Sequence, residues 1–224
     1  MDLNIRKAGN KMKKLKSLFI SAGLLMAFVI WTVLISLVDV KNVGPHGSYV
    51  GFATVNKFFH DLTGVHMTIY NITDWLGLVP LAFVIGFGIF GLLQWIKRKH
   101  ILKVDKSILI LGVFYVAVIL VYLLFEIYVV NYRPVLINGC LEASYPSSTT
   151  LLVLCVMPTA ALELNTRISN PNIIRCTECI IIAFTAFMVI GRTISGVHWL
   201  TDIIGGALLS AGLVTAYLSA GENN

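Results

Sequence analysis

The stretch SILILGVFYVAVILVYLLF, residues 107–125, contains no charged side chain. A helix of this length rises about 28 Å, close to the roughly 30 Å thickness of the hydrocarbon core of a bilayer. The stretch therefore predicts a membrane-spanning helix. The whole chain shares this character, because 57% of its 224 residues are hydrophobic, 12% are charged and the mean hydropathy is +0.84. These values exclude a soluble globular domain and indicate an integral membrane protein.

Four more uncharged stretches reach spanning length, at residues 17–38, 75–96, 143–162 and 203–221. A sixth, residues 179–191, is short unless its helix begins just after Pro171 and leaves Arg175 and Glu178 at the membrane interface. Because an unpaired backbone cannot lie in lipid, we predict an all-α polytopic membrane protein with six transmembrane helices. We expect residues 1–224 to form one domain, with residues 1–16 as a basic leader before a retained first anchor.

The distribution of lysine and arginine predicts the orientation in the membrane. Six of these residues lie in the leader, five in residues 97–106 and two in residues 167–175. The alternate segments hold the remaining ones, Lys41, Lys57, Arg133 and Arg192. By the positive-inside rule both termini are cytoplasmic, and residues 39–74, 126–148 and 192–202 face outward. The net charge of +6 then reflects topology and attraction to anionic lipid, and we expect no nucleic-acid partner.

The last outward segment, residues 192–202, has the sequence RTISGVHWLTD. If the following helix begins near His198, then His198 and Asp202 stand four apart on one face, where the carboxylate can accept a hydrogen bond from the imidazole. The other ring nitrogen keeps an outward lone pair, and Arg192 in the connecting loop would bring donors to a phosphate beside it. The alternative is a histidine and an aspartate that only cap and anchor a helix.

The other two outward segments carry weaker signals. In the second, Arg133 precedes a proline, and Ser147 and Ser148 begin the fourth span. Hydroxyls and free N–H groups at a helix N-terminus form an anion cradle, although ordinary N-capping is the better explanation when these residues are taken alone. The first segment predicts a loop and an interfacial helix over residues 52–70, which forms a lid, a wall for lipid access or a plain connector.

Arg-Pro, then Pro-Ser-Ser-Thr, then Arg-x5-His-x3-Asp, in this order at the tips of successive spans, resembles the type 2 phosphatidic acid phosphatase (PAP2) family of membrane lipid phosphatases. The motifs cover residues 126–202. The resemblance implies that Arg133 and Arg192 hold phosphate oxygens, with Ser147, Ser148 and nearby amides helping. It implies that His198 is the nucleophile that forms a phosphohistidine and that Asp202 orients it and stabilises its charge.

Two positions depart from the family pattern. Glu126 stands where the family has lysine, and Thr149 stands where it has histidine, while Gly191 replaces a serine or threonine. The chain thus lacks one phosphate-clamping cation and the residue that protonates the leaving group. Glu126 is a candidate accessory residue that replaces the missing acid or binds a cation, but a salt bridge with Arg133 is the favoured interpretation.

Thr149 suggests the substrate. An alcohol leaving group needs a proton, whereas the leaving group of a diphosphate is a phosphate with a second pKa of about 6 and departs without one. We therefore expect an outward-facing phosphatase of a polyprenyl diphosphate, such as undecaprenyl diphosphate, in a bacterial cytoplasmic membrane. The alternatives are a phosphatidic acid or phosphatidylglycerophosphate phosphatase, or a silent relative that binds or flips lipid phosphates. The single CxxC, Cys176 to Cys179, predicts no zinc site, and no cofactor is expected.

Overall fold

The computed structural model describes residues 2–221, with side chains from Met12 onward. It confirms the predicted all-α membrane protein, since six helical segments in the described residues are long and apolar enough to span a bilayer. The helices are α1 Asp2–Leu37, α2 Ala53–Thr63, α3 Met67–Leu76, α4 Leu78–Arg98, α5 Lys106–Ile127, α6 Ser148–Asn165, α7 Pro171–Ile194 and α8 Leu200–Gly221. Two short strands, β1 Lys41–Asn42 and β2 Tyr49–Val50, pair antiparallel.

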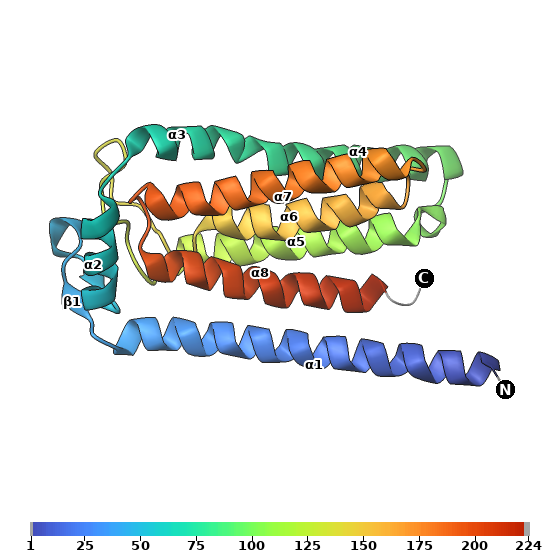
Figure 1. The fold of residues 1–224 in the computed structure, drawn as a ribbon, viewed down its shortest axis with the longest axis horizontal. Helices are drawn as coiled ribbons and strands as arrows, with labels where there is room; N and C mark the ends of the chain where they lie inside the picture. The colour runs from blue at the N-terminus through green and yellow to red at the C-terminus, as the bar shows by residue number, and fades with distance from the viewer. Residues whose placement is uncertain (1, 222–224) are drawn as a thin grey trace.

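The long helices run side by side, and the two termini lie at the same end of the bundle (Figure 1). At the opposite end α2 crosses the helix tips together with the loops (Figure 1). The expected interfacial helix over residues 52–70 is therefore divided, because α2 ends at Thr63 and α3 already belongs to the second span. That span covers Met67–Arg98 and begins eight residues before the predicted start at Trp75.

Helix α6 is the most enclosed of the spans, with 56% of its residues buried. It packs against α4, α5, α7 and α8, while α1 packs along α8. The sequence of α6 suits this position, because Thr150, Cys155, Thr159 and Ala160 are small and fully buried. The span Met67–Arg98 has only 6% of its most apolar 18-residue window buried and directs apolar side chains outward, as a lipid-facing helix does.

A polar cluster fastens the end of the bundle that carries the termini. Asp105 accepts hydrogen bonds from Gln94 at 2.7 Å and from Arg98 at 2.8 Å. Glu163 on α6 is 2% exposed, accepts a hydrogen bond from Ser107 and pairs with Arg167. The cluster joins α4, α5 and α6 through charges that would be costly in lipid without partners.

Gly205 on α8 lets that helix approach the segment before α6. A Cβ at this position would overlap the ring of Tyr145, which is 2% exposed and stacked on Phe28. The hydroxyl of Tyr145 is 2.7 Å from that of Thr32, so the ring also joins α1 to this contact.

We expect Gly205→Ala to lower stability by about 1–3 kcal/mol, because the ring of Tyr145 cannot move aside without strain. Gly86→Ala on α4 is the matched control, since nothing lies within 4 Å of its added Cβ. Alanine is the better helix former there, so the control should unfold at the wild-type temperature or above it. Thermal unfolding in detergent measures both, and equal midpoints for the two variants would contradict the packing argument.

Candidate active site

Three segments meet at the end of the bundle opposite the termini: the connection between α5 and α6, the first turn of α6, and the turn between α7 and α8. The first of these is a small hairpin. Asn138 and Gly139 have φ of 49° and 78°, and Ile137 and Cys140 exchange both backbone hydrogen bonds across them. This is the two-residue turn that an Asn-Gly pair favours. The hairpin sets the backbone of Arg133 against that of Glu142.

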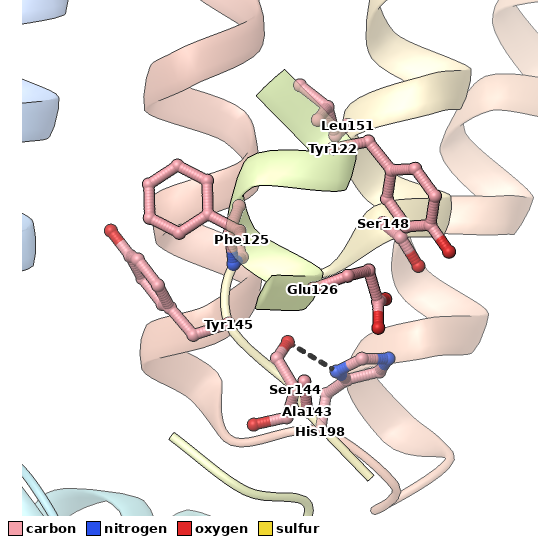
Figure 2. Close-up of a pocket in the computed structure, with 10 residues that line it drawn as sticks. Tyr122, Phe125, Glu126, Ala143, Ser144, Tyr145, Ser148, Leu151 and His198 are labelled. Atoms are coloured by element: carbon pink, nitrogen blue, oxygen red, sulfur yellow. Dashed lines mark hydrogen bonds between the residues drawn. The ribbon is translucent and has the colours of Figure 1, made fainter. Parts of the chain in front are cut away.

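His198 lies in the turn before α8 with 4% of its surface exposed. Its Nδ1 is 3.2 Å from the carbonyl oxygen of Ser144, and Figure 2 shows this contact. A carbonyl oxygen only accepts, so Nδ1 carries the proton of the neutral ring and Nε2 keeps a lone pair. The NH1 group of Arg133 lies 3.3 Å from Nε2. The lone pair on Nε2 of His198 therefore faces the guanidinium group of Arg133.

Asp202 is fully buried beside His198 but makes different contacts from those expected. Its Oδ2 accepts a hydrogen bond from the N–H of Trp199 at 2.9 Å, and its Oδ1 accepts one from Asn131 at 3.4 Å. The distance from Oδ2 to His198 Nδ1 is 3.8 Å, too long for a hydrogen bond. The reason is that α8 begins at Leu200, so the two residues do not share a helical face. Asp202 caps the helix and places negative charge near the imidazole.

Burial lowers the pKa of His198 from 6.5 to about 4, with the charges of Arg133 and Arg192 acting in the same direction. Asp202 opposes this shift without cancelling it. The imidazole is therefore neutral at physiological pH, which is the state that a nitrogen nucleophile requires.

Arg192 lies in the last turn of α7, rather than in the loop that the sequence suggested, and is 2% exposed. Its NH2 group donates to Asp74 Oδ1 at 2.8 Å and to Thr149 Oγ1 at 2.5 Å. Its Nε and NH1 groups find no hydrogen-bond partner among the described residues. The ring of Tyr70 lies 4.8 Å from the guanidinium carbon. Unpaired donors on a buried cation are costly, and an anion would satisfy them.

Gly191 explains how Asp74 reaches this arginine. A Cβ at residue 191 would lie 2.7 Å from the methyl group of Thr73 on α3. The glycine therefore lets α3 approach α7 closely enough for Asp74 to contact the neighbouring Arg192. The glycine at position 191, which departs from the family pattern, and the ion pair between Asp74 and Arg192 therefore both depend on the close approach of α3 to α7.

Arg133 does not pair with Glu126, and the favoured interpretation of Glu126 was wrong. Its Nε is 3.0 Å from Glu142 Oε2, because the hairpin places Glu142 opposite Arg133. Glu126 instead lines a small pocket with His198 and Ser148. Figure 2 shows its carboxylate directed towards the imidazole.

The polar residues at the start of α6 have two different roles: some support the backbone of the site and some face the cavity or Arg192. Ser147 is fully buried, and its N–H donates to the main-chain oxygen of Asp202 at 3.1 Å, so it supports the site from behind. Ser148 lines the cavity and opens the helix with unpaired N–H groups near it. Thr149 accepts from Arg192.

Sequence reasoning missed Tyr70, Asp74, Ser144 and Glu142. Ser144 and Glu142 were within reach, since the Asn-Gly pair predicts a hairpin that brings them opposite Asn131 and Arg133. Tyr70 and Asp74 carry no local signal, because their contact with Arg192 spans more than a hundred residues. Within the described residues no three His, Cys, Asp or Glu side chains gather in a way that could hold a metal ion.

We expect His198→Gln to flatten the dependence of stability on pH. Between pH 6.5 and about 4 the unfolded chain binds a proton that folded His198 does not, so stability is present above 6.5 and is lost as the pH falls. The wild-type free energy of unfolding should decrease in this window by up to about 1.4 kcal/mol per pH unit more than that of the variant. Thermal unfolding in one detergent at several pH values provides the comparison, and parallel curves would refute it.

Comparisons with known proteins identify the family and the fold. The sequence model of the PAP2 superfamily matches residues 107–224, more than half of the chain, while no curated protein matches it. The fold is similar to that in the crystal structure of the first transmembrane PAP2 type phosphatidylglycerolphosphate phosphatase from Bacillus subtilis. That similarity has a TM-score of 0.61 at 20% identity and covers 91% of this chain and 95% of the other. The chain is therefore a multi-pass membrane protein that belongs to the PAP2 superfamily.

Proposed function

We propose that this protein is a membrane lipid phosphatase that transfers a phosphoryl group to His198 and then to water. One observation carries the proposal: buried Arg192 has two donors without partners, in a site where Arg133 donates towards Nε2 of His198. A phosphate bound there would satisfy the arginines and place its phosphorus before the nucleophile. The family membership supports the same reaction class.

The proposed reaction has two steps, transfer of the phosphoryl group to His198 and its hydrolysis by water. Nε2 of His198 attacks phosphorus, and the bond to the leaving oxygen breaks. Arg133, Arg192 and the N-terminus of α6 stabilise the charge on the phosphoryl oxygens. The ring becomes positively charged, and the Ser144 carbonyl and the Asp202 carboxylate stabilise this charge from the Nδ1 side. Water then cleaves the N–P bond and releases phosphate.

An apolar groove supports a lipid substrate. It has a volume of about 390 Å³ and runs between α4, α5 and α6, where Leu78, Leu81, Ile119 and Leu152 line it. Its polar mouth includes Asp74, Ser148 and Thr149, and it shares Tyr122, Ser148 and Leu151 with the cavity beside His198. A hydrocarbon chain in this groove would place its phosphate at the arginines.

We propose a polyprenyl diphosphate as the substrate. Thr149 accepts a hydrogen bond from Arg192 and is not itself an acid, so an alcohol leaving group would depend on another residue for its proton, whereas a phosphate leaves without one. We place residues 1–224 in one domain, with both termini in the cytoplasm of a bacterium and the site on the outer face. The asymmetry in lysine and arginine supports this orientation.

Phosphate release by the detergent-purified protein tests the function. We expect wild type to release phosphate from an isoprenyl diphosphate faster than from phosphatidic acid. His198→Ala should abolish release, while His100→Ala, an exposed histidine in the loop after α4, should retain it. A preference for phosphatidic acid would overturn the diphosphate assignment. No release from any lipid phosphate would instead favour a silent lipid-phosphate binder.

Blocking the groove tests the lipid path. Leu81→Trp should raise KM for a long-chain substrate at least tenfold, because the indole fills the space for the hydrocarbon chain. The KM for a short, water-soluble diphosphate should stay unchanged. Ile85→Trp, one turn further along α4 and 60% exposed, is the matched control and should leave both values alone. Equal effects of the two variants would rule out this groove as the path.

A further inference from the structure

The proposed reaction needs a group that exchanges protons with the substrate and with water. Hydrolysis of a phosphohistidine is faster when a base takes a proton from the attacking water, and an alcohol leaving group needs an acid. His198 is occupied as the nucleophile. A second titratable side chain in the same cavity would supply this group.

Glu126 is the one carboxylate among the described residues that line the cavity of His198. It extends from the last turn of α5, one turn after Tyr122, which lines the same cavity. Figure 2 shows its carboxylate over the imidazole, with the hydroxyls of Tyr122 and Ser148 on the far side. Its oxygens border the space that a phosphoryl group on Nε2 would occupy.

The other carboxylates near the site are already engaged. Asp74 holds Arg192, and Glu142 lies against Arg133. Asp202 is fully buried and accepts the N–H of Trp199. Among the described residues no lysine or arginine lies within ion-pair distance of Glu126, so its proton is not fixed by a permanent partner.

We propose that Glu126 is the acid–base residue of this enzyme, a role that rests on the proposed phosphatase function. In the second step the Glu126 carboxylate takes a proton from water as the water oxygen bonds to phosphorus. The N–P bond breaks and its electrons return to Nε2. With a monoester, the protonated Glu126 first gives its proton to the leaving alkoxide. With a diphosphate, that first transfer is not required.

The change in environment on binding suits this task. Glu126 is exposed when the cavity is empty, and a lipid in the adjoining groove would cover it. The bound lipid would thus enclose the carboxylate, the phosphoryl group and the attacking water in one space, away from bulk solvent.

Rapid mixing of Glu126→Gln with labelled substrates separates the two proton transfers. With an isoprenyl diphosphate we expect one equivalent of lipid monophosphate per enzyme in a burst, followed by turnover slowed by about 10²- to 10⁴-fold. An acid-labile phosphoryl group on His198 should accumulate. With phosphatidic acid the burst itself should be slow. Glu126→Asp should recover part of the turnover.

Controls distinguish this role from others at the same position. Asp61→Asn, an exposed carboxylate on α2 at the same end of the molecule, should behave as wild type. Glu126→Lys should be as defective as Glu126→Gln in the second step, because the ammonium form of lysine has no lone pair to take a proton from water. A Lys or Gln variant with wild-type turnover would overturn the inference while leaving the phosphatase intact. Absence of any phosphoenzyme or turnover in wild type would overturn the proposed function and the inference together.

Discussion

The burial of the Arg192 guanidinium is the constraint on which the site depends. At 2% exposure the cation needs partners, and it finds them on Asp74 of α3 and Thr149 of α6, with the ring of Tyr70 beneath it. One side chain thus joins three helices at the end of the bundle. Its remaining N–H groups have no partner among the described residues. The buried arginine therefore holds the helices together and also leaves donors that an anion would satisfy.

The sequence predicted the six spans well because the length of an apolar run is a local property that lipid enforces directly. Predictions about the site held less well where they needed distant partners. Arg133 meets Glu142 instead of Glu126 because a hairpin intervenes, and that hairpin was readable from Asn138-Gly139. Asp74 was not readable, since its approach to Arg192 depends on Gly191, a residue that looked like a mild departure from the family motif.

The surroundings of His198 determine which of its ring nitrogens carries the proton and which keeps a lone pair. The Ser144 carbonyl holds the proton on Nδ1, and burial keeps the ring neutral, so the lone pair at Nε2 is present at neutral pH. Asp202 contributes charge rather than a direct hydrogen bond, and its carboxylate holds the turn that carries His198. The residues that look catalytic in the sequence are thus divided into those that face the cavity and those that support the backbone behind it.

The site lies at one tip of the bundle, and the connections that form it come from that tip alone. For the proposed reaction this makes the protein one-sided: the phosphate is released into the water on that side, and the lipid that remains stays in the nearer leaflet. Return of that lipid to the other leaflet is then a separate event, which chemistry at this one tip does not accomplish.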